Sequence, residues 1–331
     1  MNLFIKKPIE SFESDMKKSE LKRVLGKWSL TAIGIGAIIG GGIFVLTGTG
    51  AYYHAGPALA LSFVFAGIAC VFAALCYSEF ASMIPVEGSA YAYAYGTIGE
   101  LFAWIIGWGL ILEYAMGSMT VAVSWSGYFN KLLHLFGVHL PANLTNDPVS
   151  FGGAAVNLPA LVIVWFVTWI LVKGIKEAAS ANNLIVVLKV AVILFVIIMG
   201  AFYIDVANWT PFIPEETLVE HESGEMLPAY GWGGIISGAS AIFFAYIGFD
   251  AVSTQAGEAI NPKKDVPFAI VVSLLICTFL YILVSLVLTG MMNYQDFNPN
   301  GAYPDAIKAP VAYAFDIAGQ QWASYIITIA A

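Results

Sequence analysis

The feature that most constrains this chain is its series of long apolar runs. A helix that crosses a bilayer needs about 20 mostly apolar residues, and eight segments meet or approach that length: 29–54, 57–84, 97–129, 158–173, 182–203, 233–258, 266–291 and 311–331. Hydrophobic residues make up 59% of the 331 residues and charged residues only 11%, against about 25% charged in a soluble domain. The sequence therefore predicts an all-α polytopic membrane protein.

Proline and glycine divide these runs. Pro57 is expected to open the second helix, Pro85 to close it and Pro267 to start the seventh, because proline is tolerated in the first turn of a helix but not in its interior. Gly34 and Gly48 are interpreted as sites of close helix packing through small residues.

The placement of lysine and arginine predicts the orientation, because cytoplasmic loops are enriched in these residues. With a cytoplasmic N-terminus, the two outer cations are Lys131 and Lys308, and Lys189 lies within a span. The remaining cations all lie inside: Lys6, Lys7, Lys17, Lys18, Lys22, Arg23, Lys27, Lys173, Lys176, Lys263 and Lys264. The segment 204–232 is then an acidic outer loop, which accounts for part of the net charge of −8.

The first run contains the strongest sign of a broken helix. Gly40, Gly41 and Gly42 are consecutive, and each glycine costs about 1 kcal/mol relative to alanine in a helix interior. Backbone opened within a membrane is tolerated where it lines a cavity or is buried in protein, and the helix that follows the break presents free N–H groups suited to a carboxylate. Close packing is the competing interpretation; the triple glycine favours an unwound ligand site.

The sixth run carries a matching pair, Gly248 and Asp250. An acidic residue within a membrane usually faces a cavity or a partner. Gly41 and Gly248 are 207 residues apart, close to five spans, and interrupted helices at corresponding positions of two repeats are the usual sign of a transporter site.

Three strings, GIGAIIGGGIFVLTG, FFAYIGFDAVST and EAINPKKDVP, resemble the amino acid–polyamine–organocation transporters, and most closely the bacterial relatives of the cationic amino acid transporters. The resemblance runs from about Leu25 onward and implies a LeuT-type inverted-repeat fold with helices 1 and 6 broken. The implied organisation is a cytoplasmic segment 1–28, a first five-helix repeat 29–203, an outer loop 204–232 and a partial second repeat 233–331. The second repeat is incomplete, so we expect this chain to be part of a ten- to twelve-helix protein.

The resemblance also implies a set of site residues for an L-amino acid. The carboxylate is expected on N–H groups around Gly41, Gly42 and Ile43, and the ammonium on carbonyls near Ile38 and the 244–247 segment, where Phe244 is the candidate gate. The full expected substrate set is Ile38, Gly40, Gly41, Gly42, Ile43, Phe244, Ala245, Tyr246 and Ile247. The family commonly has Ser or Thr where this chain has Gly41, which removes one hydroxyl from the cradle.

Lys189 and Glu113 are further ionisable residues within spans. Taken alone, Lys189 is equally a proton-binding residue, a lysine that snorkels to the interface or a partner of Asp250. The resemblance favours proton coupling, because proton-coupled members place a lysine in helix 5. Glu113 lines the cavity, relays protons or bonds to unwound backbone, and Asp250 is a second candidate cavity acid.

The predicted function is secondary active transport of L-amino acids across the cell membrane, by proton symport and alternating access. A proton-independent exchanger of amino acids or amines and a non-transporting amino acid sensor are the alternatives. An enzyme is not expected, because the sequence has no nucleophile–base pair and its three cysteines and four histidines lack metal spacing. No cofactor other than the proton is expected. The lipid bilayer and the amino acid substrate are the expected partners, and nucleic acid is not expected. Whether a small membrane protein is a further partner is not decided by the sequence.

Overall fold

The computed structural model describes residues 4–8, 10–12, 14, 23–146, 156–173, 175–221 and 224–330, and it omits the side chains of 173–183 from this description. Lys17, Lys18 and Lys22, which entered the orientation prediction, lie outside the described residues, as does Glu222 of the acidic loop.

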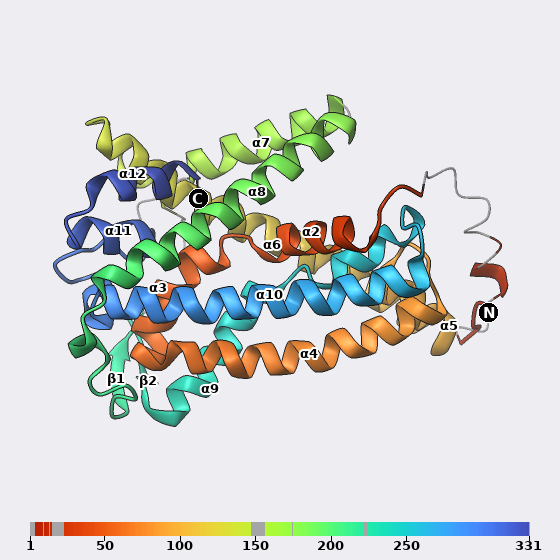
Figure 1. The fold of residues 1–331 in the computed structure, drawn as a ribbon, viewed down its shortest axis with the longest axis horizontal. Helices are drawn as coiled ribbons and strands as arrows, with labels where there is room; N and C mark the ends of the chain where they lie inside the picture. Colours follow the sequence, from red (N-terminus) through yellow and green to blue (C-terminus); the bar gives the residue numbers. More distant parts are fainter. Residues whose placement is uncertain are drawn as a thin grey trace. The chain divides into compact units, whose positions relative to one another are not determined.

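Helices account for most of the described chain (Figure 1). The α-helices are α2 Lys27–Ile38, α3 Thr47–Gly50, α4 Leu59–Met83, α5 Ser89–Thr97, α6 Glu100–Leu135, α7 Leu158–Lys173, α8 Ile175–Gly200, α9 Gly231–Ile242, α10 Pro262–Met291, α11 Pro310–Ile317 and α12 Gln321–Ala330. Two π-helical segments, Gly42–Leu46 and Ala51–Ala55, flank α3. The 3₁₀ segments are Gly56–Ala58, Ala142–Leu144, Ala201–Tyr203, Val206–Trp209, Phe243–Tyr246, Asp250–Gly257 and Tyr294–Phe297.

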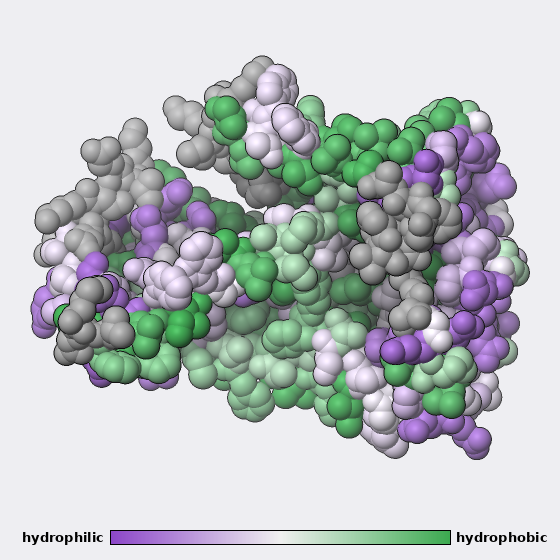
Figure 2. Space-filling view, turned by 180° about the vertical axis from the view of Figure 1, so that it is seen from behind, coloured by the Kyte–Doolittle hydropathy of each residue, from purple (hydrophilic) through white to green (hydrophobic). Residues whose placement is uncertain are grey.

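Five helical stretches among the described residues are long and apolar enough to cross a membrane: Gly42–Met83, Glu100–Leu135, Leu184–Tyr203, Gly231–Gly257 and Pro262–Met291. The predicted fourth span, 158–173, is present as the shorter apolar helix α7, which lies beside α8 in Figure 1. Hydrophobic residues cover much of the face seen in Figure 2, as expected for helices whose solvent is lipid.

Two predictions about the later helices are wrong. The seventh helix, α10, starts at Pro262, so the prediction that Pro267 starts it is wrong and Pro267 lies inside the helix. Pro262 takes the first position, where the missing N–H of proline costs nothing. The prediction of one continuous eighth span over 311–331 is also wrong, because α11 and α12 are separate helices that pack on each other. Gly319, with φ +74°, turns the chain between them.

The segment predicted as an outer loop, 204–232, contains a β-hairpin that was not predicted from the sequence. Strands β1 Thr217–Glu220 and β2 Met226–Ala229 pair antiparallel, with Thr217 opposite Ala229 and Glu220 opposite Met226. Each strand has only four residues and is mostly exposed, so neither carries a clear apolar alternation from which a strand is predicted. β2 contacts the start of α9.

The structure divides into two compact units. The first unit comprises Met1–Ile38, Gly67–Ser118 and Tyr246–Cys277. The second comprises Ile39–Ala66, Met119–Ala245 and Thr278–Ala331. Two of the divisions, after Ile38 and after Ala245, therefore fall at the interruptions predicted in the first and sixth spans.

The first unit packs α2 against the 3₁₀ segment Asp250–Gly257. Gly34 makes this possible, because a Cβ there would lie 2.6 Å from Ser273 Oγ and 2.7 Å from Val252 Cγ2. The second unit packs the segment 42–58 against α9 and α11, and a Cβ on Gly48 would lie 2.8 Å from Pro310 Cβ. Close packing at Gly34 and Gly48 is thus confirmed.

Candidate functional site

The first span is interrupted, as predicted, and the interruption covers Ile39, Gly40 and Gly41. Helical structure resumes at Gly42 with a π-helical turn. The first N–H groups of a helix have no carbonyl partner within that helix, so Gly42, Ile43 and Phe44 present their N–H groups at the break. The location of the break follows from the glycines, which lose most from being held in a helix.

Lys189 of α8 is bonded to this break. Its Nζ donates a hydrogen bond to the carbonyl oxygen of Ile39 at 2.9 Å, within the second unit. Ile39 is 1% exposed, so its carbonyl, released from the helical pattern, has little access to other donors. A buried carbonyl without a partner costs about 1–3 kcal/mol. Lys189 therefore satisfies a backbone acceptor that the break creates.

The three glycines also allow neighbouring segments to approach the break. A Cβ on Gly42 would lie 2.7 Å from Ala245 Cβ, and one on Gly40 would lie 3.2 Å from Val121. A Cβ on Gly41 would overlap the side chain of Ser124. Both interpretations of the triple glycine therefore hold: the backbone is open at Ile39–Gly41, and a Cβ at Gly40, Gly41 or Gly42 would crowd a neighbouring segment. Binding of a ligand at these residues stays a prediction.

Within the second unit, the sixth span meets the first at Ala245. The Ala245 carbonyl accepts a hydrogen bond from Tyr281 Oη of α10 at 3.1 Å, and the Phe44 carbonyl accepts one from Tyr128 Oη of α6 at 2.8 Å. Two buried tyrosines therefore bond the backbone near the predicted substrate residues. Phe244, the candidate gate, is half-buried.

The other predicted substrate residues, Ile38, Tyr246 and Ile247, belong to the first unit. Ile38 and Tyr246 are buried, with 2% and 0% of their surface exposed. The interruption of the sixth span follows them: Gly248 has φ +104°, a conformation that residues with a Cβ rarely adopt. A Cβ on Gly248 would also lie 2.7 Å from the Ala37 carbonyl oxygen. The predicted break near Gly248 is therefore present.

Asp250 starts the 3₁₀ segment after this break and is 2% exposed. Its Oδ2 accepts hydrogen bonds from Tyr114 Oη of α6 at 2.7 Å and from Ser89 Oγ of α5 at 3.4 Å. Its Oδ1 is buried and has no hydrogen-bond partner among the described residues. Glu113 precedes Tyr114 and is half-buried, near enough to Asp250 for the two ionised carboxyls to repel.

Both acids are predicted from the sequence, but their partner residues and the two backbone-bonded tyrosines are not: Tyr114, Ser89, Tyr128 and Tyr281. The position of Tyr114 beside Glu113 in an apolar helix was the only available signal, and it is weak, because tyrosine is common in membrane helices. The other three come from elements far from their partners in the sequence.

A family model described as amino acid permease matches residues 25–331. The chain is 47% identical over 333 residues to the branched-chain amino acid permease BcaP of Bacillus subtilis (strain 168), and 46% identical over 330 residues to the methylthioribose transporter of the same organism. Both alignments cover 100% of this chain and 67% of the relative. The chain is 37% identical over 314 residues to the vacuolar cationic amino acid transporter 4 of Arabidopsis thaliana, covering 94% of this chain and 49% of that protein.

Proposed function

Because this chain belongs to the amino acid permease family, we propose that it serves the secondary active transport of L-amino acids, by proton symport and alternating access. Membership confirms the resemblance inferred from the three sequence strings. It makes the chain part of a multi-pass membrane transporter family, with a LeuT-like fold, and not of an enzyme family. The chain spans about two thirds of the bacterial relatives named above, so its activity and substrate are part of the proposal.

The observation that carries the proposal is the hydrogen bond from Lys189 to the Ile39 carbonyl. A hydrogen bond from an ammonium is about twice as strong as one from a neutral donor. Loss of the proton from Lys189 therefore weakens the link between α8 and the broken first span. The proton thus favours one arrangement of the break, and a ligand can move an equilibrium only by such a difference in affinity.

Substrate recognition follows from the two broken spans. The amino acid carboxylate accepts hydrogen bonds from the N–H groups of Gly41, Gly42 and Ile43, at the positive end of the helix that starts at Gly42. Within the second unit, the ammonium donates to carbonyls of Phe244 and Ala245, and Phe244 closes over the bound substrate. These contacts use backbone atoms, so they recognise the amino acid head group and leave the choice of side chain to the rest of the cavity.

Ser124 supplies a hydroxyl that Gly41 lacks. Its Oγ occupies the space in which a side chain at position 41 would begin, and Ser124 is 9% exposed. We therefore assign to Ser124 the hydroxyl contact that relatives make from the first span. In Ser124→Ala, the KM for the substrate is expected to rise with little change in kcat, and an unchanged KM contradicts this assignment.

Asp250 and Glu113 are assigned to the proton pathway. Two carboxyls close together in a low-dielectric setting repel when both are ionised. Asp250 Oδ1, which has no hydrogen-bond partner in the described part of the chain, is the acceptor position that a proton or a donor would fill. Tyr114 holds the other carboxylate oxygen in place at 2.7 Å.

The orientation is assigned from the cation distribution, with the N-terminus in the cytoplasm and the protein in the cell membrane. The hairpin β1–β2, the acidic residues around it and the segment 292–309 are then outside.

The direct test is uptake by the full-length protein in proteoliposomes, across a panel of L-amino acids, with and without an inward proton gradient. Gradient-stimulated uptake of at least one amino acid is expected. Counterflow that does not respond to pH favours the exchanger, and saturable binding without uptake favours a sensor. Methylthioribose belongs in the panel because one relative carries that name; uptake of methylthioribose without any amino acid overturns the proposed substrate class.

A further inference from the structure

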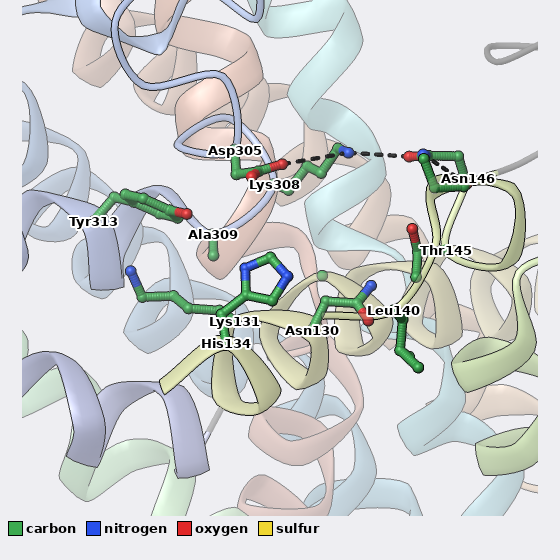
Figure 3. Close-up of a pocket in the computed structure, with 12 residues that line it drawn as sticks. Asn130, Lys131, His134, Leu140, Thr145, Asn146, Asp305, Lys308, Ala309 and Tyr313 are labelled. Carbon is green, nitrogen blue, oxygen red and sulfur yellow. Dashed lines mark hydrogen bonds and ion pairs between the residues drawn. The ribbon is translucent and has the colours of Figure 1, made fainter. Parts of the chain in front are cut away.

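The second unit contains a polar pocket of about 180 Å³ between the end of α6, the loop after it and the segment before α11 (Figure 3). None of the residues singled out in the sequence as substrate or coupling residues lines it. Figure 3 shows Asn130, Lys131 and His134 of α6 opposite the side chains of Asp305 and Lys308. Water occupies about 30 Å³ per molecule in the liquid, so this pocket has room for a small organic solute.

An ion pair joins α6 and α11 beside the pocket. Lys131 of α6 is 6% exposed and pairs with Asp316 of α11. Its Nζ also lies 3.3 Å from the centre of the Tyr313 ring, a cation–π contact. Gly127 brings the two segments together, since a Cβ there would lie 2.9 Å from the Lys308 carbonyl oxygen. Lys131 therefore already has partners for its charge, and its role in the pocket is structural.

Lys308 and Asp305 supply the charges that remain open to a ligand. Their Nζ and Oδ1 atoms lie 3.6 Å apart, and both side chains are about half exposed, at 50% and 47%. Lys308 Nζ also donates to Asn146 Oδ1 at 3.0 Å. An ammonium has three donors, so Lys308 keeps one, and the Asp305 carboxylate keeps most of its acceptor positions.

Asn130 provides an acceptor that lacks a donor. Its Oδ1 is buried and has no hydrogen-bond partner among the described residues. Such a group costs about 1–3 kcal/mol unless a donor reaches it, and buried polar groups in native structures are nearly all satisfied. A ligand that complements the pocket therefore donates hydrogen bonds to Asn130 and Asp305 and accepts one from Lys308.

We propose that this pocket binds an α-amino acid zwitterion. The ammonium donates to Asp305 and to Asn130 Oδ1, and the carboxylate accepts from Lys308 Nζ. Because the two protein charges lie 3.6 Å apart, the ligand must carry its two charged groups on the same carbon atom. An α-amino acid does so, whereas an ω-amino acid separates them. This site is separate from the residues proposed for the transport cycle. Its role as a second, outer binding site for the transported substrate rests on the proposed function.

The test is protection of a cysteine placed in the pocket. Ala142 lines the pocket and is exposed, so Ala142→Cys is made in a background where the exposed Cys76 is replaced by serine, and is labelled with an impermeant maleimide. L-leucine at ten times its Kd is expected to slow labelling about tenfold, by mass action. Isobutyrate, ethylamine and 6-aminohexanoate at the same concentration are expected to give no protection.

Variants assign the protection to this pocket. Asp305→Asn and Asn130→Leu are expected to abolish protection while leaving the ligand-free labelling rate unchanged, which shows that the fold persists. Asp296→Asn, in the same unit and outside the pocket, is the matched control and is expected to retain it. A cysteine at the exposed Leu218 of β1 reports general changes in accessibility and is expected to show none.

The pocket and the proposed transport function fail separately. Gly42→Val, which fills the first-span break, is expected to leave protection intact. Protection that disappears in Gly42→Val but persists in Asp305→Asn overturns the inference, because the cysteine then reports events at the break. If no amino acid protects the cysteine while uptake is normal, the inference about the pocket is wrong and the proposed transport function stands. Conversely, protection without uptake leaves the pocket standing and contradicts only the proposed function.

Discussion

The breaks in the first and sixth spans are stabilised by opposite charges. At Ile39–Gly41, a cationic side chain, Lys189, donates to a freed carbonyl at 2.9 Å. After Gly248, an anionic side chain, Asp250, accepts from hydroxyl groups. The first break depends on three consecutive glycines, at each of which a Cβ would crowd a neighbouring side chain, and the sixth depends on one glycine with φ +104°.

This difference indicates a division of roles. A cation bonded directly to open backbone links its charge to the geometry of the break. A carboxylate bonded to side-chain hydroxyls has a charge that can change with less effect on the backbone. The first break is therefore expected to be the more sensitive to substitution in transport, and the sixth the more sensitive in folding stability.

Filling the first break is expected to have the largest effect. In Gly42→Val, the new Cβ would lie 2.7 Å from Ala245 Cβ and 2.8 Å from its Cα, so the backbone must move. Displacement of a binding site by about 1 Å can cost about 100-fold in rate, and we expect a loss of that order in initial uptake. Gly109→Ala in α6, where no atom of the described residues lies within 4 Å of the added Cβ, is the control. Uptake by Gly42→Val above half the unmodified rate would contradict the role assigned to this break.

Removing the cation at the first break is expected to have the second-largest effect on transport. Lys189→Gln retains a donor for the Ile39 carbonyl but loses the charge. Uptake without a gradient is expected to persist at a reduced rate, while stimulation by an inward proton gradient disappears. The measurement is the ratio of initial uptake with and without the gradient, and Lys264→Gln, at an exposed position of α10, is the control. If the proton gradient stimulates uptake by Lys189→Gln as much as uptake by the unmodified protein, Lys189 is not part of the coupling mechanism.

Both breaks could be predicted from the sequence because their causes are local. Consecutive glycines and an acid in an apolar run are visible without any knowledge of the fold. The partners of these residues could not be predicted: Lys189 and Ile39 are 150 residues apart, and Lys131 and Asp316 are 185 apart. The polar pocket was missed for the same reason, since its residues look like ordinary loop residues until the fold brings them together.

The strain at the sixth break gives a third prediction. Gly248→Ala places a Cβ in a left-handed conformation, which costs about 1–2 kcal/mol, and sets it 2.7 Å from the Ala37 carbonyl oxygen. Gly137→Ala also places a Cβ at a positive φ, +73°, but no atom of the described residues lies within 4 Å of it, so it is the control that lacks the contact. Thermal unfolding in detergent is expected to show a larger decrease in Tm for Gly248→Ala. Equal decreases would mean that α2 does not constrain the sixth break.

The smallest effect is expected at the hydroxyl partner of Asp250. Tyr114→Phe removes the 2.7 Å hydrogen bond to Oδ2 and leaves the longer one from Ser89; the loss of such a bond typically costs about 1 kcal/mol. A double-mutant cycle with Asp250→Asn, read out by Tm, measures the interaction, and Tyr91→Phe, whose side chain is 41% exposed, is the control. A coupling energy near zero would show that Tyr114 does not hold the carboxylate. Loss of gradient-stimulated uptake in Tyr114→Phe as complete as in Lys189→Gln would show instead that the sixth break carries coupling as directly as the first, and the division of roles would be wrong.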